Sequence, residues 1–82
     1  MNVQELKKEI EKLGVPSRWY SINGHLCSDT YILNEVYYYW EYFYMDEKGR
    51  QMNYRRFDNE NDACTFFLEK LKTEMRYQNG DY

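Results

Sequence analysis

The sequence predicts an α+β domain in which both helices lie on one face of a three-stranded antiparallel sheet, in the order α-β-β-β-α. Two observations predict it. The chain has an amphipathic helical pattern near each end, and between them lies a segment rich in aromatic and β-branched residues, which favour strands. A chain of 82 residues fits one domain. We expect it to span residues 1–76, followed by a frayed tail at 77–82.

The first helix is predicted at Val3–Leu13. Apolar residues recur there at spacings of three and four, and charged residues occupy the remaining positions. Gly14 suits the left-handed residue that ends a helix, and Pro16 prevents the helix from continuing. The next segment, Ser17–Asp29, contains the turn signal Ser-Ile-Asn-Gly and no sustained period, so it is predicted to be an irregular connection.

Three strands are predicted, at Thr30–Leu33, Tyr37–Met45 and Gln51–Phe57. A turn at Asp46–Gly49 is predicted to join the last two strands, because the glycine at its end can adopt the left-handed conformation of a bulge residue. This turn predicts the cross-strand pairs Glu41 with Arg55, Tyr42 with Tyr54, and Tyr44 with Met52. One face would then carry Trp40, Tyr42, Tyr44, Met52 and Tyr54, and the other Tyr39, Glu41, Phe43 and Arg55.

The second helix follows Asp58 or Asn59, either of which can cap it. Acidic residues near its start and basic residues near its end suit the helix dipole. One apolar stripe is formed by Ala63, Cys64, Phe67, Leu68, Leu71 and Met75.

The strongest functional signal is an acidic, aromatic block. The net charge is −3, and no Lys or Arg lies between Arg18 and Lys48, a stretch that holds ten of the sixteen aromatic residues. At positions 37–44, seven of eight residues are aromatic. A strand with one buried face needs only every second residue for the core, here Tyr38, Trp40, Tyr42 and Tyr44. The surplus rings either pack under the preceding connection or form a binding surface, for which Tyr and Trp are well suited.

Enzyme, metal and cofactor chemistry are disfavoured, so we expect no catalytic residue, no metal site and no cofactor. His25 is the single histidine, and it cannot form a triad with Ser28 and Asp29 of the same loop. Cys27 and Cys64 are expected to be reduced and inert thiols. The four glycines are isolated, so no phosphate-binding loop is present.

Double-stranded RNA binding domains share the order α-β-β-β-α, which leaves nucleic-acid binding through Arg50, Arg55 and Arg56 as an alternative. Charge argues against it. Those domains place lysines at the start of the second helix, whereas this chain has Asp58-Asn59-Glu60-Asn61-Asp62 there. Acidic residues at that position would repel phosphates.

Several segments together resemble a family of small immunity proteins that accompany bacterial polymorphic toxins, including those of contact-dependent growth inhibition. The resemblance covers roughly residues 14–71 and rests on Gly14-Val15-Pro16, Tyr20-Ser21-Ile22-Asn23-Gly24, Trp40-Glu41-Tyr42-Phe43-Tyr44 and the run from Phe57 to Phe67. It implies a cytosolic antidote that binds the C-terminal domain of a cognate toxin, often a nuclease, and blocks its active site or its access to substrate. It assigns no contact residues.

Combining the resemblance with the residue pattern, we expect a cytoplasmic protein, not an enzyme, that binds the basic surface of a toxin domain. No apolar stretch is long enough for a membrane span, and the charged first helix is unlike a secretory signal. A homodimer, formed through the aromatic face or an edge strand, stays open as a further alternative. The expected partner-binding residues are Tyr37, Tyr39, Glu41, Phe43, Asp46 and Glu47.

Overall fold

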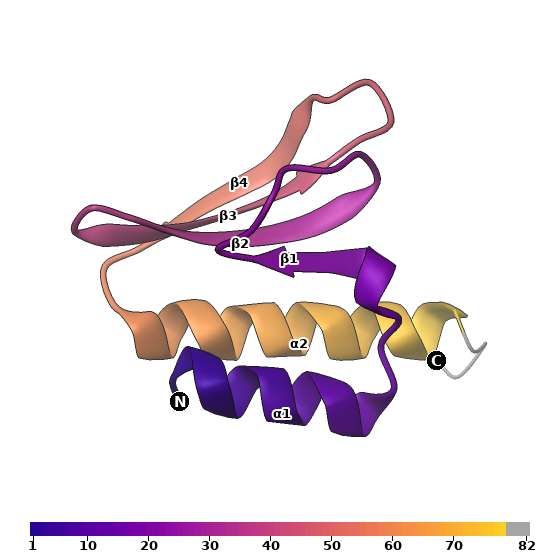
Figure 1. The fold of residues 1–82 in the computed structure, drawn as a ribbon, viewed down its shortest axis with the longest axis horizontal. Helices are drawn as coiled ribbons and strands as arrows, with labels where there is room; N and C mark the ends of the chain where they lie inside the picture. Colours follow the sequence, from indigo (N-terminus) through magenta and orange to yellow (C-terminus); the bar gives the residue numbers. More distant parts are fainter. Residues whose placement is uncertain (79–82) are drawn as a thin grey trace.

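Two helices lie side by side along one face of a four-stranded sheet in the computed structural model, which describes residues 1–78 (Figure 1). The predicted α+β class and the placement of both helices on one face are confirmed. The elements, in chain order, are α1 (Val3–Leu13), the 3-10 helix η1 (Ser17–Trp19), β1 (Tyr20–Ile22), β2 (Thr30–Val36), β3 (Tyr39–Met45), β4 (Gln51–Phe57) and α2 (Glu60–Gln78).

Helix α1 begins and ends at well-defined caps. The Asn2 side chain accepts a hydrogen bond from the backbone N–H of Glu5, whose carboxylate accepts one from the N–H of Asn2, which is a capping box. At the other end Gly14 has a φ of 74°, a left-handed conformation that glycine adopts without strain. The predicted helix end is therefore confirmed.

The prediction of three antiparallel strands is wrong, because the sheet has a fourth strand and is mixed. Strand β1, within the predicted irregular connection, pairs with β2 in parallel, and the sheet order is β1-β2-β3-β4. Its three residues are too few to show a period in sequence. Asn23 then turns the chain at a φ of 53° and secures it to β2: its N–H donates to Leu33 O, and its Oδ1 accepts from Glu35 N.

Strands β2 and β3 form a hairpin whose turn is Tyr37-Tyr38. Tyr37 was expected inside the second strand. It instead has a φ of 53°, so the chain reverses there and β3 begins two residues later. Register along the hairpin places Leu33 opposite Tyr42 and Tyr31 opposite Tyr44. Side chains of this row point toward the helices.

A β-bulge changes the register between β3 and β4. Tyr44 lies opposite Met52, as expected, but Tyr42 lies opposite Arg55 and Glu41 opposite Arg56. Asn53, with a φ of 58°, lies in the bulged part of β4. Because one extra residue flips every later side chain to the other face, the expected faces of Tyr54 and Arg55 are exchanged.

Helix α2 packs beside α1 and under β3 and β4. Asn59 caps it, because its Oδ1 accepts from Asp62 N at 2.8 Å. The two helices start at the same end of the molecule (Figure 1), where the N–H of Val3 donates to the Glu60 carboxylate at 2.9 Å. The helix extends through Gln78, two residues into the expected tail. The rest of that tail, 79–82, lies outside the described residues.

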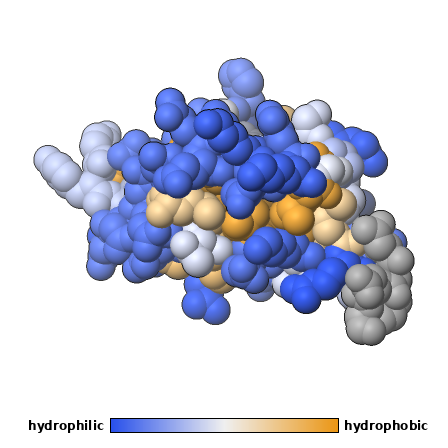
Figure 2. Space-filling view, turned by 90° about the horizontal axis from the view of Figure 1, so that it is seen from below, coloured by the Kyte–Doolittle hydropathy of each residue, from blue (hydrophilic) through white to orange (hydrophobic). Residues whose placement is uncertain are grey.

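The main core lies between the helices and the sheet. Figure 2 shows its outer margin as a narrow apolar band between two hydrophilic ones on the helix side of the molecule. Neither helix of residues 1–78 combines the length and apolar character that crossing a bilayer requires. Buried core residues are Leu6, Ile10, Val15, Leu33, Trp40, Tyr42, Ala63, Cys64, Phe67, Leu68 and Leu71.

Candidate binding surfaces

The six residues predicted to bind a partner do not form one surface. Tyr37 lies at the hairpin turn that precedes β3, whereas Asp46 and Glu47 lie in the turn that follows it, at the opposite end of the sheet (Figure 1). Tyr39, Glu41 and Phe43 lie between these ends on the sheet face turned away from the helices. The sequence argument assigned residues along one strand to a single contact surface. The seven extended residues of β3, however, place its two ends about 20 Å apart.

Phe43 is not available to a partner, and its prediction as a contact residue is wrong. Its side chain is only 1% exposed, and its cross-strand neighbour Ile32 is fully buried. Both lie outside the cluster that faces the helices. Phe43 is buried because of the parallel strand β1, which the sequence analysis did not detect. Since β1 and β2 run in the same direction, the chain must cross back from the end of β1 to the start of β2. The connection at 23–29 does so on the side opposite the helices (Figure 1), which gives this face a small core of its own.

Tyr39 and Glu41 are half-buried and engaged with β4. The guanidinium of Arg56 lies 3.9 Å from the centre of the Tyr39 ring, and the Tyr54 hydroxyl donates to Glu41 Oε1 at 3.1 Å. Arg55 points to the helix side, 5.6 Å from the centre of the Phe66 ring. The expected basic cluster is therefore split, because Arg55 and Arg56 lie on opposite faces.

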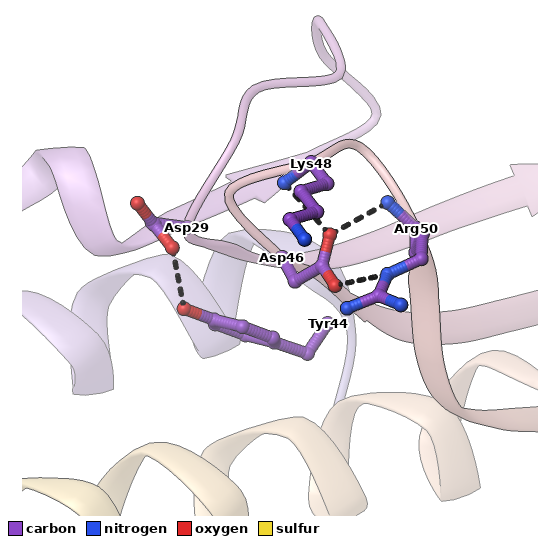
Figure 3. A network of polar contacts seen from close by, with 5 residues as sticks. All are labelled: Asp29, Tyr44, Asp46, Lys48 and Arg50. Atoms are coloured by element: carbon purple, nitrogen blue, oxygen red, sulfur yellow. Dashed lines mark hydrogen bonds and ion pairs between the residues drawn. The ribbon is translucent and has the colours of Figure 1, made fainter.

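Asp46 organises its turn (Figure 3). Its Oδ1 accepts from the backbone N–H groups of Lys48 and Arg50, at 2.9 and 2.8 Å, and its Oδ2 accepts from Arg50 Nε at 2.8 Å. The hydrogen bond from the Arg50 backbone is the largest of several that hold the pKa of the Asp46 carboxyl below its ordinary value. Asp46 is thus a turn-forming residue, while Glu47 beside it is exposed.

The hairpin turn carries the two most exposed large hydrophobic side chains within residues 1–78. Tyr37 is 89% exposed and Tyr38 is 96% exposed, so Tyr38 does not fill the core as expected. We call Tyr37 and Tyr38 the tyrosine tip. Glu35 and Phe57 both pair with Trp40. The carboxylates of Glu35 and of Asp58, which follows Phe57, therefore lie at the same end of the sheet as the tip. The tip is thus an aromatic projection with carboxylates nearby.

A pocket of about 250 Å³ lies at the opposite end of the sheet, between η1 and the last turns of α2. The rings of Tyr31 and Tyr44 face each other across the β2–β3 pair, with centroids 4.8 Å apart. The Tyr44 hydroxyl donates to Asp29 Oδ1 at 3.3 Å (Figure 3). Sequence reasoning missed this site, because its residues come from four separate segments: Arg18, Trp19, Asp29, Tyr31, Tyr44, Glu74 and Gln78.

Tyrosines at the pocket are held in the neutral form. Burial, followed by the charge of Glu74 and a hydrogen bond to it, raises the pKa of Tyr31 well above its ordinary value. Burial and then the Glu74 charge raise the pKa of Tyr42 to about 12. The pKa of Tyr44 is raised by burial and then by Asp29. Tyr42 lies one row deeper on β3, and its buried hydroxyl has no hydrogen-bond partner within residues 1–78.

The remaining candidates for chemistry are dispersed. Cys27 is an exposed thiol, whereas Cys64 is buried in the core, where burial raises its pKa to about 11. His25 lies in the exposed connection at 23–29. Within the described residues, no three histidine, cysteine or carboxylate side chains come together as metal ligands would. No protein-family model, curated protein or solved structure matches this chain.

Proposed function

We propose that this chain is a cytoplasmic immunity protein that binds the C-terminal domain of a cognate bacterial toxin, a nuclease, and neutralises it by occlusion. The tyrosine tip carries the proposal. Two large aromatic side chains are nearly fully exposed and contribute nothing to the core. Exposed rings of this kind supply rigid contact area at a low cost in conformational entropy, which is what a protein-binding anchor needs.

The charge distribution supports a basic partner. Carboxylates flank the tyrosine tip at one end of the sheet, and Asp29, Glu47 and Glu74 lie at the other. A nuclease must itself present basic residues to bind phosphates. Complementary charge would accelerate the encounter of the two proteins. The resemblance to immunity proteins points to the same partner.

The test is complex formation with the toxin domain encoded beside this gene. Replacing both tip residues, Tyr37→Ala with Tyr38→Ala, is expected to weaken the complex by about 30-fold or more, as loss of a central aromatic anchor does. Lys7→Ala is the control, because Lys7 is an exposed residue on α1, which contributes to neither the tip nor the pocket. An unchanged dissociation constant for the tip variant would remove the tip from the interface, and no complex at micromolar concentration would overturn the proposal.

A homodimer is the second candidate, and β4 favours it. This strand lies at the edge of the sheet, and all its residues except Phe57 are exposed. An unpaired edge can hydrogen-bond to the same edge of a second copy. Sedimentation of the chain alone decides between a monomer and a dimer.

The structure gives nucleic-acid binding less support than the sequence did, because the three arginines proposed for it do not form one surface. Arg50 pairs with Asp46, and Arg55 and Arg56 point to opposite faces. Titration with duplex RNA at low salt tests it. Affinity that falls as salt is added would restore this alternative.

A further inference from the structure

The pocket between η1 and α2 combines aromatic walls with carboxylates. Its volume of about 250 Å³ is below the roughly 300–1,000 Å³ of small-molecule sites. It therefore suits a single side chain better than a cofactor or a nucleotide.

The pocket offers hydrogen-bond acceptors on Asp29, Tyr44 and Glu74, beside the donors of Arg18 and Trp19. The Tyr44 hydroxyl donates its proton to Asp29, and Glu74 lines the pocket together with Tyr31. Because the Tyr44 proton is used in this way, the Tyr44 phenol oxygen and the remaining carboxylate lone pairs are left to accept. An occupant that donates hydrogen bonds therefore fits these acceptors, and a positive charge would balance the two carboxylates.

The walls distinguish between the two basic side chains. The Tyr31 and Tyr44 rings meet at 56°, and Trp19 also lines the pocket. A guanidinium is planar, weakly hydrated and able to stack on aromatic rings while it donates in its own plane. An ammonium is compact and strongly hydrated, so it gains less from such walls. We propose that this pocket receives the guanidinium of an arginine side chain from a protein partner. The inference rests on the proposed function, in which that partner is the toxin domain.

Two cations of the chain itself lie near the pocket. Lys70 Nζ is 3.9 Å from Glu74 Oε1, a long and partly exposed pair that contributes little. Arg18 lines the pocket, is exposed, and forms no ion pair with any residue of 1–78. Its charge opposes entry of a second guanidinium. Removing it should strengthen binding, an effect opposite in sign to that of removing a carboxylate.

The first test uses a peptide and the full chain. The peptide acetyl-Gly-Arg-Gly-amide is titrated into the isotope-labelled protein, and the resonances of Trp19, Tyr31 and Tyr44 are followed. We expect saturable shifts with a dissociation constant on the order of 1 mM. The same peptide with citrulline, which has the shape of arginine without its charge, should bind at least about tenfold more weakly. Equal shifts with both peptides would overturn the proposal.

Variants give the second test. Asp29→Asn keeps a residue that tolerates the φ of 55° found there, and Glu74→Gln keeps the side-chain length. Each should weaken binding of the arginine peptide by about fivefold or more, whereas Arg18→Gln should tighten it by about twofold or more. Lys7→Gln, on the exposed side of α1 and outside the pocket, should change nothing. A peptide affinity that is the same in all four variants would contradict the proposal.

The two proposals fail separately. If the toxin complex forms but Asp29→Asn and Glu74→Gln leave its dissociation constant unchanged, the arginine site is wrong and the proposed function stands. If the arginine peptide binds as expected but no toxin complex forms, the proposed function is wrong. The pocket is then an arginine site for a different partner.

Discussion

The guanidinium of Arg56 lies over the ring of Tyr39, 3.9 Å from its centre, and joins the edge strand β4 to its neighbour β3. The hydrogen bond from Tyr54 to Glu41 lies beside it on the same face. Two residues that the sequence suggested as contacts for a partner thus hold β3 to β4. Side chains on this face of the sheet contact one another across β3 and β4. The two ends of the sheet are therefore the better binding surfaces.

Loss of the Arg56 contact should destabilise the fold slightly. We expect Arg56→Gln to lower the free energy of unfolding by about 0.5–1 kcal/mol, the usual contribution of a cation–π contact at a partly exposed site. Urea unfolding followed by circular dichroism measures it. Lys7→Gln on the exposed side of α1 is the matched control, with no change expected. An equal loss in both variants would mean that the effect reflects net charge and not the ring contact.

Stability should fall at alkaline pH because of the buried tyrosines. Tyr42 has a pKa of about 12 in the folded chain and near 10.0 when unfolded. Above pH 10 the folded state therefore retains a proton that the unfolded state has lost. The stabilisation is complete below pH 10 and is lost as pH rises toward 12, by about 2–3 kcal/mol. Urea midpoints between pH 8 and 11, with tyrosinate absorbance as a second probe, measure the trend.

Tyr42→Phe isolates this contribution. It removes a buried hydroxyl that has no partner within residues 1–78, so we expect the free energy of unfolding at pH 7 to rise by about 1 kcal/mol. The variant should also lose stability less steeply above pH 10. Destabilisation at pH 7 would show instead that the hydroxyl makes a hydrogen bond in solution.

Charge reversal should separate the two acidic residues of the β3–β4 turn. Glu47→Lys is expected to slow association with a basic toxin domain several-fold at low salt and to leave stability unchanged, because Glu47 is exposed. Asp46→Lys should lower the melting temperature, because Asp46 accepts three hydrogen bonds that shape the turn. Stopped-flow association rates and thermal melts measure the two effects. An on-rate for Glu47→Lys equal to wild type would exclude steering by this turn.

The two thiols should react very differently. Cys27 is exposed, whereas Cys64 is fully buried and its pKa is raised to about 11. At pH 8 we expect one thiol per chain to react with Ellman's reagent within minutes in the native state, and two in 8 M urea. Cys27→Ser should abolish the native reaction. Rapid reaction of both thiols without urea would mean that α2 opens readily.

Much of the fold followed from periodicity and terminal signals. Both helices, the Gly14 end of α1 and the cap at Asn59 were predictable, because they depend on residues adjacent in sequence. The pair Tyr44 with Met52 was predictable for the same reason, since it lies next to the turn. Beyond this pair, Asn53 adopts a left-handed conformation, which its residue type permits but does not dictate, so the bulge could not be predicted. The bulge exchanges the faces on which Tyr54 and Arg55 lie.

The candidate sites were harder to predict, because they depend on contacts distant in sequence. The sequence left open whether Tyr37 is covered or exposed, and the structure shows it exposed, at a hairpin turn and not within a strand. For Phe43 the sequence offered burial under the preceding connection or a binding surface, and the choice of the binding surface was wrong because β1, which fixes the path of that connection, was not detected. The pocket was missed because Glu74 belongs to the far end of α2, and nothing in the sequence links it to Tyr31.

The hydrogen bond between Val3 and Glu60 has a consequence for how the chain folds. Strands β2, β3 and β4 pair through short turns, so their contacts close small loops and should form early. Helix α1 packs on α2, nearly the whole chain away in sequence, and closing that loop costs the most entropy. We therefore expect α1 to dock last and to detach first, which would make hydrogen exchange in α1 faster than in α2.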